Sequence, residues 1–137
     1  MAKILVIEDS PTNMKLTGFL LTNFGHTVLY AVDAEIGLVT ACNEQPDLIL
    51  MDIQLPGMNG MTATALLKKD CRTAAIPIIA YTALASKSDQ EKCLLAGCAA
   101  YVSKPVGYQQ LSEVISRHLL KPQPSSLIEG VTYLQAS

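Results

Sequence analysis

The sequence lacks the cysteine and histidine spacing of a zinc-binding protein. Its four cysteines include no C-x-x-C pair, and its two histidines lie far apart. We instead expect buried thiols in a reducing cytosol, because free cysteine packs as a small hydrophobe. The residues concerned are Cys42, Cys71, Cys93, Cys98, His26 and His118.

Charge is also scarce. Charged residues make up 16% of the chain and the formal net charge is -2, so we find no basic stripe for direct contact with nucleic acid. Half of the residues are apolar, which argues against disorder. The N-terminal MAKILVIEDS has one lysine and a short apolar run that stops at two acids, which fits a first strand better than a secretion signal or a membrane span. We therefore expect a cytoplasmic protein without membrane insertion.

The length of 137 residues suits one domain. We assign residues 1–120 to this domain and residues 121–137 to a C-terminal tail or the start of a linker, because KPQPSSLIEGVTYLQAS opens with prolines and serines. No DNA-binding or enzymatic output motif fits into this tail. We expect a stand-alone protein, and a fragment of a longer chain is the alternative.

Apolar runs of strand length alternate with segments of helical length. This alternation predicts an α/β fold with a doubly wound, five-stranded parallel sheet and helices on both faces. The predicted strands cover residues 4–7, 27–31, 48–51, 76–81 and 99–102. The predicted helices begin at Ser10-Pro11, Asp33, Asn59-Gly60, Ser86 and Gly107, and the last one continues to about Leu120.

Polar side chains follow several of these strands. Glu8 and Asp9 end the first, Asp52 ends the third, Thr82 ends the fourth, and Lys104 follows the fifth. Ligands of such folds bind outside the carboxyl ends of the strands, so we expect these side chains to converge at one edge of the sheet.

Three carboxylates at one edge repel each other unless a cation offsets their charge. Oxygen ligands without nearby cysteine or histidine favour a hard divalent ion, and so few carboxylates suit Mg²⁺, which retains waters and bridges to phosphate oxygens. Asp52 could then act as a nucleophile that accepts a phosphoryl group, with Lys104 and the Thr82 hydroxyl contacting that group. Each residue also has a simpler explanation: a turn or cap residue for Asp52, a strand end for Thr82 and a surface charge for Lys104.

The ordered set of motifs resembles the response-regulator receiver domain of two-component signalling. The motifs are ILVIEDS, DLILMDIQLPGMNG around a single aspartate, IPIIAYTA ending near a threonine, and GCAAYVSKP, and the resemblance extends from Lys3 to about Leu120. It implies a flavodoxin-like strand order of 2-1-3-4-5.

The resemblance also implies a role for each site residue. Asp52 would be phosphorylated from a histidine kinase or histidine phosphotransfer protein, and Lys104 would contact the phosphoryl group. Thr82 and Tyr101 would form a switch that alters a protein-binding face on the fourth helix, fifth strand and fifth helix, and Lys104-Pro105 would be a cis bond. The implied Mg²⁺ ligands are Glu8, Asp9, Asp52 and the backbone carbonyl of Gln54.

The resemblance implies a phosphoprotein signalling module with a downstream protein target. Its only chemistry would be self-catalysed phosphotransfer and dephosphorylation at Asp52, so it would not be an enzyme with a separate substrate. The alternatives are an unphosphorylated scaffold of the same fold and a receiver of a longer hybrid kinase or multidomain regulator. An aspartyl phosphatase or a flavin protein fits less well, because Gln54 replaces the acid of a D-x-D pair and no glycine-rich loop follows the first strand.

Overall fold

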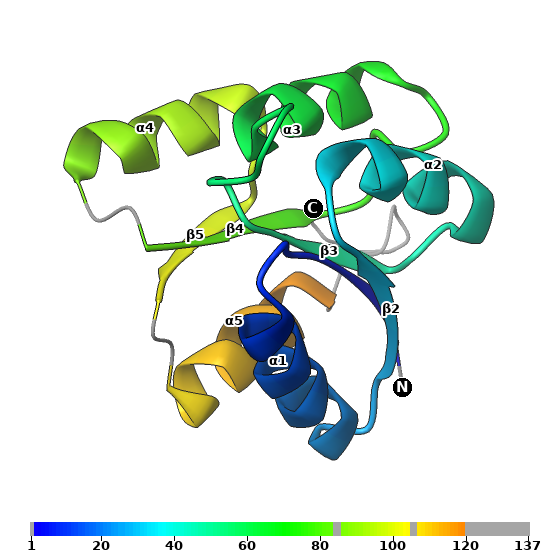
Figure 1. The fold of residues 1–137 in the computed structure, drawn as a ribbon, viewed down its shortest axis with the longest axis vertical. Helices are drawn as coiled ribbons and strands as arrows, with labels where there is room; N and C mark the ends of the chain where they lie inside the picture. The colour runs from blue at the N-terminus through cyan, green and yellow to red at the C-terminus, as the bar shows by residue number, and fades with distance from the viewer. Residues whose placement is uncertain (1, 84–85, 105–106, 120–137) are drawn as a thin grey trace, which may run out of the picture.

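The computed structural model describes residues 2–83, 86–104 and 107–119. Within these residues, five strands alternate with five helices along the chain (Figure 1). The strands are β1 (Lys3–Ile7), β2 (Thr27–Ala31), β3 (Leu48–Met51), β4 (Ile78–Thr82) and β5 (Ala100–Ser103). The helices are α1 (Pro11–Asn23), α2 (Ala34–Glu44), α3 (Gly60–Lys69), α4 (Lys87–Ala96) and α5 (Tyr108–Leu119).

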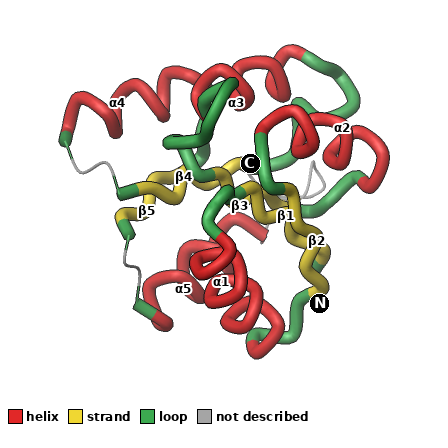
Figure 2. Tube along the Cα trace, viewed as in Figure 1, coloured by secondary structure: helices red, strands yellow, loops and turns green. Residues whose placement is uncertain are grey.

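The strands form one parallel sheet in the order β2-β1-β3-β4-β5, which confirms the predicted topology. Helices α1 and α5 cover one face of the sheet, and α2, α3 and α4 cover the other (Figures 1 and 2). Two apolar clusters fill the spaces between the sheet and these layers. Every residue of β3 is buried, as expected for a central strand with helices on both faces.

Side-chain caps fix where the helices begin, as the sequence predicts. The Ser10 side chain accepts a hydrogen bond from the Asn13 backbone N–H, and Pro11 occupies the first helical turn. Asp33, Asn59 and Ser86 cap α2, α3 and α4 in the same way. These short-range contacts set where each helix leaves the edge of the sheet.

The bounds of three strands differ from the prediction, and the first of these, β1, begins one residue earlier, at Lys3. Strand β4 begins at Ile78 rather than at residue 76, because Pro77 has no amide hydrogen for the ladder. Its Thr82 pairs with Ser103 of β5, so both strands extend one residue beyond their predicted ends. The additional pair extends the β4–β5 ladder to the residue before Lys104.

The expectation that all the cysteines are buried is wrong for part of the set. Cys93 and Cys98 are buried, but Cys42 is half-buried and Cys71 is exposed. Cys71 directly follows Asp70, the C-cap of α3, and therefore lies in a surface turn. Across the described residues, no helix is both long and apolar enough for a membrane span. The tail 121–137 and Pro105, with its predicted cis bond, lie outside the described residues.

Candidate functional site

The three predicted acids meet at the carboxyl edge of the two central strands. Glu8 continues the ladder beyond β1, where its backbone N–H donates to the Ala31 carbonyl at 3.0 Å. Asp52 continues β3, where its N–H donates to the Ile7 carbonyl at 3.0 Å. The carboxylates of Glu8, Asp9 and Asp52 offer oxygen atoms that all lie within 4.8 Å of one another. The parallel topology thus brings together acids that are distant in the sequence.

Lys104 binds two of these acids at once. Its Nζ donates to Glu8 Oε1 at 2.6 Å and to Asp52 Oδ2 at 2.9 Å. Its backbone N–H also donates to the Thr82 carbonyl at 2.9 Å, which fixes the residue at the end of β4. Burial by itself lowers the pKa of Lys104, but the hydrogen bonds to Glu8 and Asp52 outweigh this effect and raise it. The cation that offsets the acids is therefore present in the chain itself.

Backbone amides hold the remaining oxygens of the two buried acids. The Ser10 N–H donates to Glu8 Oε2 at 3.1 Å, and the Gln54 N–H donates to Asp52 Oδ1 at 3.0 Å. Glu8 and Asp52 are 2% and 5% exposed, whereas Asp9 is exposed. The Gln54 amide thus orients Asp52, and the use of the Gln54 carbonyl as a metal ligand stays a prediction.

Glycines shape the loop that follows Asp52. Gly57 has a φ of +72°, in the left-handed region that favours glycine. Gly60 is the first residue of α3 and packs directly against the backbone of the site. A Cβ at this position would lie 2.5 Å from the Asp52 carbonyl oxygen and 2.8 Å from Ile53 Cα. Helix α3 therefore approaches the site backbone more closely than any side chain would permit.

The donor set fits a hard divalent cation. All three groups are carboxylates, and the oxygen-only cluster that they form matches the ligands preferred by Mg²⁺. Glu8, Asp9 and Asp52 could hold the ion. Because Lys104 also binds Glu8 and Asp52, the two cations would share these carboxylates.

The predicted switch residues lie on neighbouring strands. Tyr101 pairs with Ala80, and Thr82 lies two residues further along β4, so Thr82 and Tyr101 face the same side of the sheet. Thr82 is fully buried. The Tyr101 hydroxyl is also buried, with no hydrogen-bond partner of ordinary geometry among the described residues. Burial raises the pKa of Tyr101, and the nearby Ser103 side chain offsets part of this effect.

Sequence reasoning missed a contribution from Tyr81. Lys104 Nζ lies 5.0 Å from the centre of the Tyr81 ring, within the range of a cation–π contact. The sequence pattern singles out the next residue of β4, Thr82, because its hydroxyl lies at the strand end. Strand alternation together with the predicted convergence of strand ends could have placed Tyr81 near Lys104.

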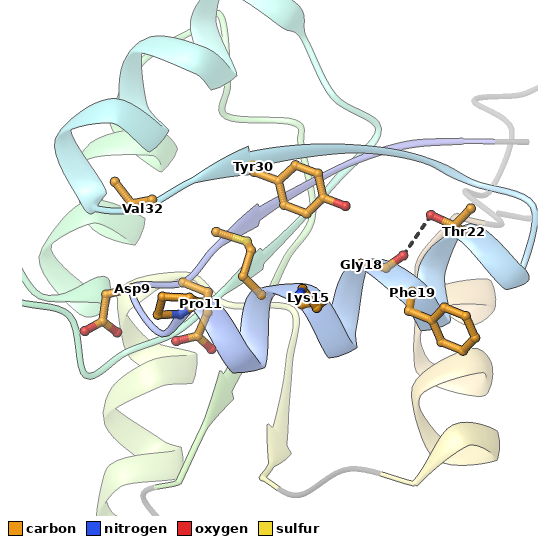
Figure 3. Close-up of a pocket in the computed structure, with 10 residues that line it drawn as sticks. Asp9, Pro11, Lys15, Gly18, Phe19, Thr22, Tyr30 and Val32 are labelled. Carbon is orange, nitrogen blue, oxygen red and sulfur yellow. Dashed lines mark hydrogen bonds between the residues drawn. The ribbon is translucent and has the colours of Figure 1, made fainter.

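An apolar groove between α1 and β2 borders the acids (Figure 3). Its volume is about 610 Å³, and Asp9 lies at one end while Phe19 and Thr22 lie at the other. Phe19 is 64% exposed, and the neighbouring Leu16 is exposed as well. A contiguous apolar surface of this kind beside a functional site commonly marks a contact surface.

The chain matches known proteins over most of its length. Residues 4–116 match the family described as "Response regulator receiver domain". The chain is 40% identical over 116 residues to the protein PilH of Pseudomonas aeruginosa, with 85% of this chain and 96% of PilH covered. It is also 40% identical to the polar-differentiation response regulator DivK of Brucella anthropi, covering 85% of this chain and 94% of DivK.

A solved structure with the same fold carries the predicted metal. It is the receiver domain of the sensor histidine kinase PA1611 of Pseudomonas aeruginosa, with a magnesium ion coordinated in its active-site cleft. The TM-score is 0.81 at 33% identity, and the match covers 86% of this chain and 97% of that domain. With the fold, the acid cluster and the family match in agreement, the chain belongs to the response regulator receiver domain family of two-component signalling.

Proposed function

We propose that Asp52 accepts a phosphoryl group from the histidine of a kinase or phosphotransfer protein. The observation that carries this proposal is the position of Asp52, a 5% exposed carboxylate that shares Lys104 with Glu8 at the carboxyl edge of the sheet. A buried acid with one cation and two neighbouring acids is arranged to receive further positive charge or a phosphoryl group with its metal.

The transfer forms one bond and breaks one. A carboxylate oxygen of Asp52 attacks phosphorus, the new O–P bond forms as the N–P bond to the donor imidazole breaks, and the electron pair returns to that nitrogen. Lys104 offsets the negative charge of the phosphoryl oxygens. Mg²⁺, when bound by Glu8, Asp9, Asp52 and the Gln54 carbonyl, supplies further positive charge to these oxygens.

The group that is phosphorylated and dephosphorylated is Asp52 of the chain itself, and not a separate substrate molecule. Later attack of water on the acyl phosphate releases inorganic phosphate and regenerates the Asp52 carboxylate. We therefore regard the chain as a signalling module with self-catalysed phosphotransfer and dephosphorylation, and not as an independent enzyme.

The phosphoryl group acts as a switch through charge. It adds about 1.5 to 2 negative charges and three acceptor oxygens beside Thr82. We propose that Thr82 moves toward these oxygens and that the population shifts toward the arrangement in which the Tyr101 hydroxyl is buried. The packing of α4, β5 and α5 changes with it, and a downstream protein binds this face. The burial of the Tyr101 hydroxyl and its position on the same side of the sheet as Thr82 support this part of the proposal.

The phosphodonor protein needs a surface beside Asp52, and we assign it to the exposed face of α1. Phe19 and Leu16 provide apolar area there, and the adjacent groove ends at Glu8 and Asp9. A protein bound to this face would therefore lie beside the acids of the proposed phosphorylation site. This continuity favours the donor as the occupant of the surface.

Incubation with Mg²⁺ and acetyl phosphate tests the proposal, with intact-mass spectrometry as the readout. The wild type should gain one phosphoryl group, and Asp52→Asn should gain none. Asp47→Asn is the matched control, because Asp47 precedes the same strand at its opposite end and is exposed. An equal adduct on Asp52→Asn, or no adduct on the wild type, would contradict the assignment.

A further inference from the structure

We propose that Tyr81 is a positioning residue for Lys104, and that Thr17 of α1 fixes Tyr81 in turn. The inference rests on the proposed function, in which Lys104 contacts the phosphoryl group on Asp52. It adds a pair of residues on the α1 side of the sheet to the site.

The Tyr81 ring and the two acids surround the Lys104 ammonium. The ring centre lies 5.0 Å from Nζ, while Glu8 Oε1 and Asp52 Oδ2 lie 2.6 and 2.9 Å from it. Tyr81 is only 6% exposed, so its ring is held by packing. An aromatic face attracts a desolvated cation. The ring therefore supplies an attractive contact to Nζ that remains when an oxygen partner is taken away.

The register of the sheet explains why these residues meet. Tyr81 pairs with Val102, and Lys104 follows Val102 by two residues, so Tyr81 and Lys104 belong to the same side of the sheet. The Lys104 N–H bond to the Thr82 carbonyl continues the β4–β5 ladder to this point. The backbone thus directs the lysine stem toward the ring before any charge contact is made.

Thr17 links this arrangement to α1. Its hydroxyl donates to the Tyr81 hydroxyl at 3.5 Å, and Thr17 is 1% exposed. The contact is at the long end of hydrogen bonding, so its role is orientation more than strength. Both residues lie in the region between the sheet and the layer of α1 and α5, where Tyr81 belongs to the apolar cluster. The orientation of the ring is therefore determined by packing and by this one polar contact.

The contact between Tyr81 and Lys104 matters when Asp52 is phosphorylated. The incoming phosphoryl group and its metal compete with Lys104 for Asp52 and Glu8. A lysine side chain is flexible and loses rotamer freedom when it is held in one place. The Tyr81 ring keeps Nζ beside the site while its oxygen partners change from carboxylate to phosphoryl oxygens.

Nuclear magnetic resonance of the unphosphorylated protein tests the contact directly. Protons on the Lys104 Cε next to an aromatic face should resonate upfield of those of the exposed Lys69. The upfield shift should persist in Tyr81→Phe, which keeps the ring, and disappear in Tyr81→Leu. Unshifted Lys104 resonances in the wild type would overturn the inference, and this readout does not depend on phosphorylation.

Phosphorylation by acetyl phosphate tests the consequence. We expect Tyr81→Leu to react about fivefold more slowly than the wild type, equivalent to about 1 kcal/mol in the barrier. Tyr81→Phe should recover most of this loss, and Thr17→Val should show a smaller one. In a Lys104→Ala background the Tyr81→Leu change should have no further effect, because Tyr81 acts through Lys104.

The outcomes separate this inference from the proposed function. Absence of an adduct on the wild type would refute phosphoryl acceptance at Asp52. Equal rates for wild type and Tyr81→Leu, or an undiminished Tyr81→Leu effect in the Lys104→Ala background, would overturn only the role of Tyr81. Thermal unfolding checks that each variant folds, and Tyr81→Met replaces Tyr81→Leu if the latter does not, because methionine fills irregular apolar space without a ring.

Discussion

Lys104 Nζ donates to Asp52 Oδ2 at 2.9 Å, so the carboxylate that we propose as the phosphoryl acceptor is already ion-paired in the resting structure. The same ammonium binds Glu8, and both acids are buried. The resting charge balance of the site therefore depends on one lysine. Removing it leaves two buried carboxylates without their internal cation.

Replacement of Lys104 by methionine should destabilise the protein in the absence of metal. We expect a loss of about 1–3 kcal/mol in the free energy of unfolding, because charged hydrogen-bonding groups stay buried without partners. Saturating Mg²⁺ should restore part of this loss, since the metal replaces the missing positive charge. Urea unfolding with and without Mg²⁺ measures both effects. Lys69→Met, on the exposed end of α3, is the control and should change little.

The pH dependence of this contribution follows from the raised pKa of Lys104. A group with a higher pKa in the folded state stabilises the protein fully below its unfolded pKa and loses this effect as pH rises through the folded pKa. The pKa of a lysine in the unfolded chain is about 10.4. The difference in unfolding free energy between wild type and Lys104→Met should therefore be constant from about pH 7 to 9 and shrink only above about pH 10. Urea unfolding across this range measures it, and a decline already below pH 9 would contradict the prediction.

Phe19→Ser should slow phosphotransfer from a donor protein without changing the rate of labelling by acetyl phosphate. Phe19 is 64% exposed and lies at the far end of the groove from Asp9, so the substitution should not disturb the acids or the fold. An aromatic anchor in an interface commonly contributes about 2 kcal/mol or more, which corresponds to a loss of at least tenfold. The assay compares phosphoryl transfer from a phosphorylated histidine kinase of the same genome with labelling by acetyl phosphate. Equal losses with both donors would place the defect in the site and not in docking. Leu95→Ser, on the exposed face of α4, is the matched control for loss of surface apolar area.

Gly60→Ala should damage both stability and phosphoryl acceptance. A Cβ at this position would lie 2.5 Å from the Asp52 carbonyl oxygen and 2.8 Å from Ile53 Cα, and neither backbone atom can yield easily. We expect about 1–3 kcal/mol of destabilisation together with slower labelling by acetyl phosphate. Gly107→Ala is the control, because a Cβ there meets nothing within 4 Å. Equal melting temperatures for Gly60→Ala and the wild type would show that α3 does not need this close approach.

The order of elements and the helix caps could be predicted from the sequence because both depend on short-range patterns. Ser10 and Asp33 each satisfy a backbone amide three residues away, and the apolar run of β3 marks a central strand directly. The meeting of Glu8 with Asp52 followed from topology, because parallel strands end at the same edge. These inferences needed no side-chain geometry.

The pairings of Lys104 could not be predicted in the same way. Lys104 and Glu8 are separated by 96 positions, and their contact depends on rotamers and on the exact end of β5. The sequence pattern predicts a metal as the cation beside the acids, whereas in the structure Lys104 offsets part of their charge. The exposure of Cys71 was missed for a related reason, since composition does not place a residue in a surface turn.

Tyr81 and Thr82 are neighbours in β4, yet strand geometry sends their side chains to opposite faces of the sheet. Tyr81 meets α1 through Thr17, whereas Thr82 lies on the side of Tyr101 and the layer that includes α4. The two side chains therefore pack into different layers, yet both residues contact Lys104, whose ammonium faces the Tyr81 ring and whose backbone N–H donates to the Thr82 carbonyl. A substitution in either layer can therefore reach Asp52 by its own route, through Tyr81 from the layer of α1 and α5 or through Thr82 from the layer of α2, α3 and α4.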